Sequence, residues 1–218
     1  YVTYIMLAAQ MDRILEELNE IADTRLVGSR AMGLELDDSD IDVIMISDDP
    51  EYVRDVVIDR YNPIIDRDDR IIRLIADIDG YQVDIFVLRP DHRMVTDRLN
   101  HVRRYSNMLT QRDIATIMEL KEWAIDHHVY DSGIGYLGGV IILEMYYSMR
   151  PRDRTIHGFL SFYGNMPYHR FSRMANDWRR RGVLSFMNKY TWNTITAEMR
   201  SPEPLPLIPQ WVTTDPIR

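Results

Sequence analysis

The 218-residue sequence contains no cysteine and no long apolar run, and each of these two absences excludes a class of protein. Without cysteine the chain forms no disulfide and no thiolate metal site, which fits a reducing, intracellular compartment, cytoplasmic or nuclear. No apolar run approaches the roughly 20 residues of a membrane-spanning helix, and the first residues do not form a signal peptide. The sequence therefore predicts a soluble globular protein with no membrane partner.

Charge is divided unevenly along the chain. Residues 1–100 hold 23 acidic and 11 basic residues, a net charge of −12, whereas residues 101–218 hold 11 acidic and 15 basic residues, a net charge of +4. An acidic half beside a mildly basic half suits a metal-dependent enzyme that acts on a polyanion. Because lysine is so scarce, Lys121 is noticeable wherever a motif includes it.

Residues 26–46 (LVGSRAMGLELDDSDIDVIMI) combine a glycine–serine turn with an acidic strand. Asp40 and Asp42 are two apart in an alternating pattern, so on a strand they point to the same face. Neighbouring carboxylates raise each other's pKa unless a cation lies between them, and Mg²⁺ binds both carboxylate and phosphate oxygens. Backbone N–H groups of a turn at Gly28 and Ser29 suit a phosphate. This combination indicates nucleotidyl transfer.

A solvated acidic turn is the alternative interpretation of the same stretch. It fits Asp37 and Asp38, which lie in the loop, better than Asp40 and Asp42, which alternate with apolar residues. The local pattern leaves both interpretations open, because short motifs also occur by chance.

The first half of the chain predicts helices and strands in one lobe. Apolar residues at helical spacing predict a helix over 5–22, and a further helix is expected over 51–60. Asp79-Gly80 between two alternating runs predicts a hairpin of residues 70–80 and 81–90. Asp84 lies in the middle of the second run. It is either a residue on the solvated face of an edge strand or a third carboxylate that meets Asp40 and Asp42 across the sheet.

The second half is mainly helical. Helical periods cover 93–106 and 110–127, and a basic amphipathic stretch covers 170–189. Between them lie a glycine-rich segment at 131–139 and an apolar run at 140–149. The last residues are rich in proline and are expected to be extended. The predicted architecture is α+β: a lobe at residues 1–92 with a mixed sheet and flanking helices, then a mainly helical domain at residues 93–218.

Three stretches together resemble a known family. GSRAMG, DSDIDV and the later VDI are similar to the motifs of the DNA polymerase beta-like nucleotidyltransferase superfamily. LKEWAIDHHVYDSGIGYLGGVIILEM (120–145) resembles the central domain of poly(A) polymerases and archaeal-type CCA-adding enzymes, which carry L-K-x-W-A, a tyrosine and G-[FY]-L-G-G-V. Weaker similarities lie in FLSFYGNMPY (159–168) and EPLPLIPQ (203–210). The resemblance covers residues from about 20 to about 210.

In the first lobe the resemblance implies a catalytic and metal site. Asp40 and Asp42 would bind two Mg²⁺ (or Mn²⁺) ions, and Asp84 would bind the metal that activates the primer 3′-hydroxyl. Gly28 and Ser29 would hold the triphosphate of the incoming nucleotide. Arg30 is expected to add a phosphate contact.

In the second lobe the resemblance implies the rest of the nucleotide site, in a cleft between the lobes. Lys121 would contact phosphates and Tyr130 would lie near the base and ribose. Gly138, Gly139 and Val140 would line the pocket, where only small residues allow close approach. Taken singly, these residues fit a solvated helix lysine, a core tyrosine and close helix packing; their joint order favours the nucleotide site.

The sequence therefore predicts a template-independent RNA 3′-terminal nucleotidyltransferase that resembles poly(A) polymerases and transfers AMP from ATP to an RNA 3′-hydroxyl by a two-metal mechanism. Its partners would be ATP or another NTP and an RNA 3′ end. The sequence stops soon after the proline-rich segment, where related enzymes continue, so either further domains are missing from it or a compact form needs a protein partner or a second copy. The alternatives are a CCA-adding tRNA nucleotidyltransferase, a cyclic oligonucleotide synthase or small-molecule nucleotidyltransferase, and a catalytically silent nucleotide-binding subunit.

Overall fold

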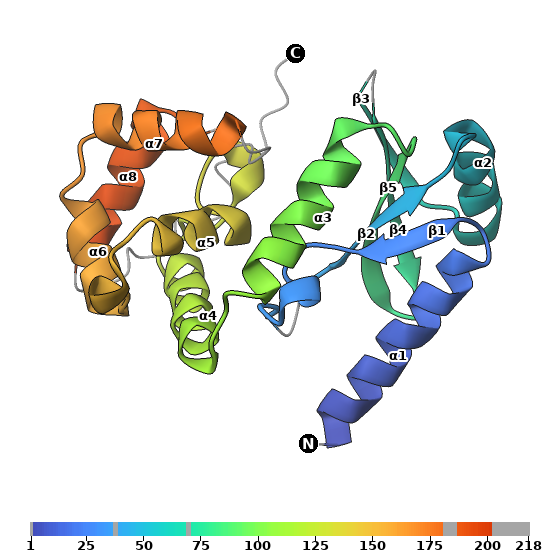
Figure 1. Ribbon diagram of the computed structural model, residues 1–218, viewed down its shortest axis with the longest axis horizontal. Helices are drawn as coiled ribbons and strands as arrows, with labels where there is room; N and C mark the ends of the chain where they lie inside the picture. The colour runs from blue at the N-terminus through green and yellow to red at the C-terminus, as the bar shows by residue number, and fades with distance from the viewer. Residues whose placement is uncertain (1, 37–38, 69–70, 181–186, 202–218) are drawn as a thin grey trace, which may run out of the picture. The chain divides into compact units, whose positions relative to one another are not determined.

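The chain folds into two compact units, residues 1–110 and residues 111–218, in a computed structural model (Figure 1). The structure describes residues 2–36, 39–68, 71–180 and 187–201. The proline-rich end and part of the basic stretch at 170–189 lie outside these residues. Among the described helices, none has the length and apolar character that crossing a membrane would need.

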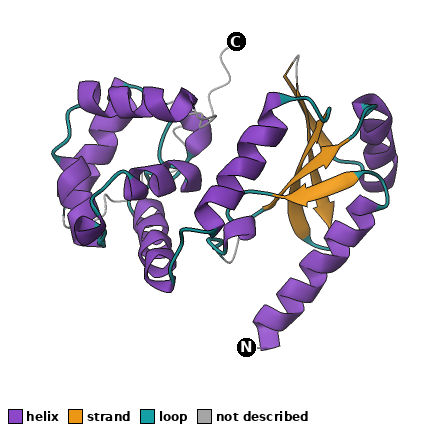
Figure 2. Ribbon diagram, in the orientation of Figure 1, coloured by secondary structure: helices purple, strands orange, loops and turns teal. Residues whose placement is uncertain are grey.

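The first unit is built on a five-stranded mixed sheet with the order β1-β2-β5-β4-β3 (Figure 2). β2 and β5 run parallel, and the other neighbouring strands run antiparallel. Its elements in chain order are α1 (Val2–Asn19), β1 (Asp23–Leu26), β2 (Ile41–Ile46), α2 (Pro50–Tyr61), β3 (Ile64–Asp68), β4 (Ile71–Ile78), β5 (Tyr81–Leu88) and α3 (Arg93–Ser106).

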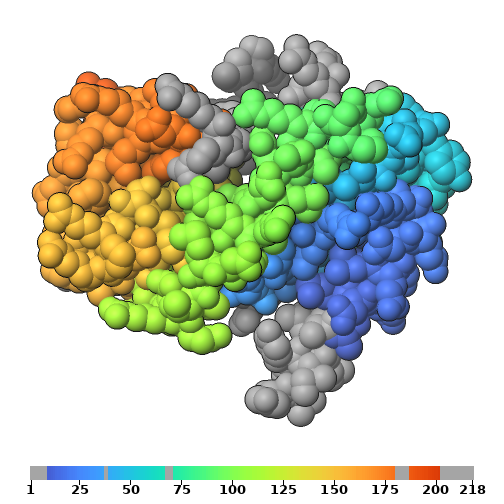
Figure 3. Space-filling view, viewed as in Figure 1, coloured from blue at the N-terminus to red at the C-terminus, as the bar shows by residue number. Residues whose placement is uncertain are grey.

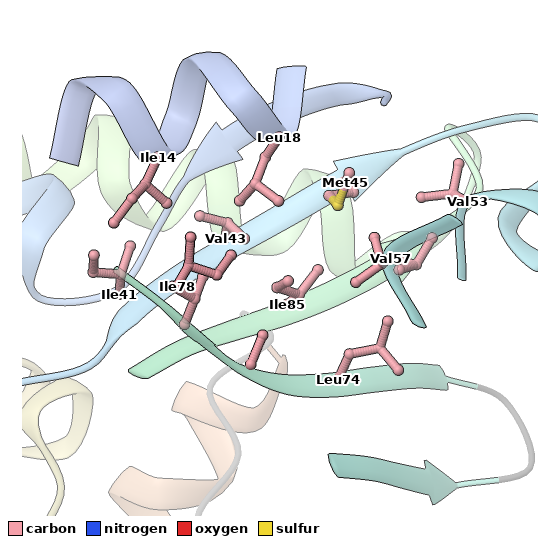
Figure 4. Packing of buried hydrophobic residues seen from close by; sticks show 13 residues of the cluster. Ile14, Leu18, Ile41, Val43, Met45, Val53, Val57, Leu74, Ile78 and Ile85 are labelled. Atoms are coloured by element: carbon pink, nitrogen blue, oxygen red, sulfur yellow. The ribbon is translucent and has the colours of Figure 1, made fainter. Parts of the chain in front are cut away.

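Two apolar clusters cover the two faces of this sheet. On one face Ile14 and Leu18 of α1 pack with the main core, which also includes Val43 of β2 and Ile85 of β5 (Figure 4). On the other face α3 packs through Val95 and its apolar neighbours onto alternate residues of β2 and β5. Alternation along each strand therefore sends one set of side chains toward α1 and α2 and the other toward α3.

Local sequence signals explain the main boundaries. Asp79 and Gly80 adopt positive φ angles of 56° and 82°, as a two-residue turn of type I′ requires, and this turn joins β4 to β5. Asp49 caps α2, where its side chain accepts a hydrogen bond from the Tyr52 N–H at 3.1 Å. The helices predicted at 5–22 and 51–60 and the predicted hairpin are confirmed. β3 is an edge strand that the sequence did not predict.

The position of α3 differs from the predicted division of the chain. The sequence placed a boundary after residue 92, which assigned α3 to the helical domain. The compact units divide after residue 110, so α3 belongs to the first unit and forms a ridge on its surface (Figure 3, green). Its apolar side covers one face of the sheet, and the helical period alone cannot reveal which element a helix packs against.

The second unit is helical. It contains α4 (Gln111–Asp126), α5 (Gly139–Tyr147), α6 (Ile156–Gly164), α7 (Tyr168–Arg180) and α8 (Lys189–Arg200). In α5 every residue from 141 to 146 is buried, so this helix lies in the middle of the unit. Trp192 of α8 stacks on Phe171 of α7 at 3.9 Å between ring centroids, and its indole N–H donates to the Met166 carbonyl at 2.8 Å.

Candidate active site

The first unit brings three of the predicted residues together. Asp42 in β2 and Asp84 in β5 are direct partners in the parallel pairing, and Asp40 immediately precedes β2. One carboxylate oxygen from each of the three lies within 4.8 Å of the others. Hard divalent cations prefer such an all-oxygen donor set, so the residues present fit Mg²⁺ or Mn²⁺.

The cluster lies on the face of the sheet that α3 covers. Phe86, two residues after Asp84 and therefore on the same face, packs with Val95 of α3. Asp84 is 4% exposed, while Asp40 and Asp42 are half-buried. The strand alternation thus carries carboxylates at one end of this face and an apolar core at the other.

Burial and like charge raise the pKa of two of these carboxyl groups. The pKa of Asp42 rises from 3.8 to about 7, first because the group is buried and then because Asp40 and Asp84 are close; Arg98 and Arg73 oppose the rise. The pKa of Asp40 is also raised, by burial and by Asp84. A bound cation would favour the ionised form of these carboxyl groups. Cation binding would therefore lower the raised pKa values and offset the repulsion among the three carboxylates.

Gly28 is packed directly against this cluster. Its φ is +72°, and a Cβ placed on it would lie 2.0 Å from Oδ2 of Asp42. The residue before Gly28 also holds this turn against β2, because the Val27 N–H donates to the Asp42 carbonyl at 2.9 Å. Ser29 follows, half-buried, and its carbonyl accepts from the N–H groups of Met32 and Leu34, both at 3.0 Å. Of the two predicted phosphate-binding residues, Gly28 therefore adjoins the carboxylates, and Ser29 follows it in the turn.

Arg30, for which a phosphate contact is expected, donates hydrogen bonds to backbone carbonyls of its own unit. It is 8% exposed, and its Nε donates to the carbonyls of Ser39 and Asp40, each at 3.1 Å. Nη2 also donates to the Ser39 carbonyl. The guanidinium therefore fixes the loop that leads into β2 and with it the backbone of Asp40.

Two arginines that the sequence interpretation missed lie against the carboxylates. Arg73 of β4 donates to both oxygens of Asp84, from Nε and Nη2, each at 2.8 Å. The guanidinium carbon of Arg98, in α3, lies 4.3 Å from the centroid of the Phe86 ring, and its pKa is lowered by burial. The hairpin turn could have predicted the position of Arg73. The register that this turn sets pairs Arg73 with Phe86, which lies on the same face of β5 as Asp84.

The second unit gathers another set of predicted residues. Lys121 of α4 is 1% exposed. A Cβ on Gly139 would lie 3.4 Å from the Tyr130 hydroxyl oxygen and 3.8 Å from Cε of Lys121, so these three residues meet where α5 begins. A Cβ on Gly138 would lie only 2.8 Å from the Ser132 Cβ, so a side chain there would force a neighbour to move. Val140 is 37% exposed in the first turn of α5.

Comparison with known proteins assigns the class. Residues 9–105 match the family model of the nucleotidyltransferase domain. They therefore form a nucleotidyltransferase domain, and the protein is a transferase enzyme, as the sequence predicted. The α+β fold class is confirmed as well.

Several solved structures share this fold. A cytoplasmic RNA terminal U-transferase is 18% identical with a TM-score of 0.57, over 76% of this chain and 67% of the other. The Cid1 poly(U) polymerase with MgGTP bound is 17% identical with a TM-score of 0.59, over 73% of this chain and 69% of the other. Cid1 in complex with the UTP analogue UMPNPP is 16% identical with a TM-score of 0.58, over 73% and 67%. No curated protein matches the chain in sequence.

Proposed function

We propose that the protein is a template-independent RNA 3′-terminal nucleotidyltransferase, which joins a nucleoside monophosphate from an NTP to an RNA 3′-hydroxyl and releases pyrophosphate. The observation that carries the proposal is the three-carboxylate cluster, with the Gly28 backbone against it, on a nucleotidyltransferase domain. The acidic first half and the basic second half fit an enzyme whose two substrates are both polyanions.

In the proposed mechanism Asp40 and Asp42 would hold two Mg²⁺ or Mn²⁺ ions, and Asp84 would be the further ligand that serves activation of the RNA 3′-hydroxyl. Such ions lower the pKa of a coordinated hydroxyl and stabilise both the attacking and the leaving oxygens. Arg30 positions Asp40 through its carbonyl contacts. Gly28 has no side chain, so its backbone lies directly against the Asp42 carboxylate, and with Ser29 it would bind the triphosphate beside the metal site.

The proposal also assigns nucleotide contacts to residues of the second unit. Lys121 supplies a cation for the phosphates and Tyr130 a hydroxyl and ring for the ribose and base. Gly138, Gly139 and Val140 form the wall beside them. The contact between Gly139 and both Lys121 and Tyr130 supports a shared role for these side chains.

ATP is the proposed nucleotide, on the resemblance of residues 120–145 to poly(A) polymerases. UTP is the second candidate, because the structural neighbours are named as U-transferases and poly(U) polymerases. The choice depends on a few hydrogen bonds to the base edge.

Extension of a labelled RNA primer with Mg²⁺ or Mn²⁺ and each NTP separately tests the proposal. We expect one of the four NTPs to be the preferred substrate, with its nucleoside monophosphate added to the RNA 3′ end. Asp42→Ala or Asp84→Ala should slow addition by roughly a thousandfold or more, because metal-ion stabilisation is worth several kcal/mol. The control is Asp59→Ala, which removes an exposed carboxylate of α2 and should leave the rate unchanged.

Three other outcomes would replace the proposal. Addition of only C, C and A to a tRNA that lacks its CCA end would favour a CCA-adding enzyme. A cyclic or short oligonucleotide formed without RNA would favour a synthase. No turnover with any NTP and primer would favour a silent nucleotide-binding subunit.

A further inference from the structure

Arg73 occupies both oxygens of the third carboxylate of the cluster. Its Nε and Nη2 each donate to one oxygen of Asp84 at 2.8 Å, and the Asp84 side chain is only 6% exposed. A two-point arginine–carboxylate pair of this kind is among the stronger ion pairs, particularly where water is excluded. In this structure both oxygens of Asp84 are therefore already paired with a positively charged side chain of the protein itself.

The same oxygens are needed by a divalent ion. Asp84 can be a ligand in the cluster only through an oxygen within 4.8 Å of those of Asp40 and Asp42. A Mg²⁺ ion would approach that oxygen to about 2.1 Å, which places two positive charges a few ångströms apart unless the guanidinium withdraws. Arg73 and a cation on Asp84 therefore compete.

A second carboxylate is in place to keep Arg73 after it leaves Asp84. Asp66 lies directly opposite Arg73 in the pairing of β3 with β4, and its Oδ2 accepts a hydrogen bond from Nη1 of Arg73 at 3.0 Å. The Asp66 side chain is 59% exposed and that of Arg73 is 38% exposed, so this side of the guanidinium opens to solvent. Arg98 differs, because it is mostly buried over the Phe86 ring.

We propose that Arg73 is a latch on Asp84: it holds the third carboxylate while the site lacks a cation there, and it moves onto Asp66 when a divalent cation binds. This inference rests on the proposed function only in that the three carboxylates bind divalent cations. It makes Arg73 a positioning residue that sets how tightly the site binds metal before any nucleotide or RNA is present.

The latch is tested by titrating the full chain with Mn²⁺ at pH 8 without nucleotide and measuring binding by electron paramagnetic resonance. Arg73→Gln should bind Mn²⁺ more tightly than the wild type, on the order of tenfold, because a competing charge a few ångströms away is removed. Arg73→Lys should fall between the two, since one ammonium cannot engage both oxygens. Arg60→Gln is the matched control, because it removes an exposed arginine paired with Glu17 and Glu20 and should leave the affinity unchanged.

A second measurement follows Arg73 itself in the wild-type protein. In the wild-type protein, the side-chain Nε–H resonance of Arg73, assigned by its absence in Arg73→Lys, should shift as Mg²⁺ is added and reach a limit at saturation. A resonance that stays in place at saturating Mg²⁺ would overturn the latch, as would equal or weaker Mn²⁺ affinity in a folded Arg73→Gln protein.

The result separates this proposal from the proposed function. If Asp42→Ala abolishes Mn²⁺ binding but Arg73→Gln leaves it unchanged, the metal site stands and the latch is wrong. If the wild type and both Arg73 variants bind no Mn²⁺ that depends on Asp42, the metal site itself is wrong, and the latch fails with it.

Discussion

Gly28 ties the backbone of one loop to the chemistry of the neighbouring strand. Its positive φ is one that residues with a Cβ rarely adopt, and the space where a Cβ would lie is taken by the Asp42 carboxylate. At the scale of single residues, the site is thus defined as much by an absent side chain as by the three acids. The pKa of Asp42 reflects the same crowding.

Gly28→Ala should be more damaging than an equivalent change at Gly33. Both glycines have positive φ, but a Cβ at Gly33 would meet nothing within 4 Å. We expect a loss of about 3 kcal/mol in the free energy of unfolding for Gly28→Ala and about 1 kcal/mol for Gly33→Ala. Urea denaturation measures both, and equal losses would show that the contact with Asp42 is unimportant.

Asp42 should make the metal-free protein less stable as the pH rises. Its folded pKa, about 7, lies above the ordinary 3.8, so the stability that this group contributes is present below pH 4 and is lost as the pH rises through 7. Asp42→Asn should therefore stabilise the protein in EDTA more at pH 8 than at pH 5. The two unfolding free energies measure this, with Asp59→Asn as the control; a gain independent of pH would contradict the raised pKa.

At the scale of elements, two sets of buried side-chain contacts hold segments together. Arg30 joins the short helical turn at Arg30–Met32 to the loop before β2. His127 and Glu198 join the end of α4 to α8 through a contact of 3.1 Å between Nδ1 and Oε2, with side chains 8% and 5% exposed. We expect the loss of either contact to lower the free energy of unfolding.

Arg30→Ala should weaken metal binding although Arg30 is not expected to touch the metal. Without the guanidinium, the partly buried carbonyls of Ser39 and Asp40 lose this donor, at a cost of roughly 1–3 kcal/mol, and the Asp40 carboxylate loses its fixed position. Mn²⁺ affinity and urea denaturation measure the two effects. Unchanged Mn²⁺ affinity would mean that Asp40 is positioned by other contacts.

Glu198→Ala should destabilise the second unit by about 3 kcal/mol, because it leaves His127 buried without this partner. Glu198→Gln keeps an acceptor oxygen and should cost only about 1 kcal/mol. All four tryptophans lie after residue 110, so tryptophan fluorescence reports this unit during urea denaturation. Losses of equal size in the two variants would mean that the negative charge, not the hydrogen bond, is what matters.

At the scale of the whole molecule, the carboxylate cluster and the tryptophans belong to different compact units. A ligand stabilises the state that binds it, so Mn²⁺ should raise the midpoint for unfolding of the first unit, by an amount that grows with its concentration. Hydrogen exchange in β2 and β5 should slow, while the midpoint from tryptophan fluorescence should change little. Asp42→Ala is the control; equal shifts in both units would mean that they unfold as one.

Much of the first unit could be predicted from its pattern. The Asp79-Gly80 turn fixed the register of β4 and β5, and apolar spacing predicted the helices. The edge strand β3 could not be predicted, because IIDRD has no apolar alternation and gains its order by pairing with β4. The same pairing places Asp66 beside Arg73, a contact between strands that no local pattern contains.

The sequence by itself predicted a nucleotidyltransferase and the three acids that the structure brings together. Alternation placed Asp40 and Asp42 on one face, and the hairpin placed Asp84 in the middle of a strand, because both depend only on neighbours along the chain. The tertiary structure decided what surrounds them. Packing of α3 onto the sheet assigned it to the first unit, burial raised the pKa of Asp42, and strand pairing put Arg73 on Asp84. These depend on distance in space, which the order of residues does not specify.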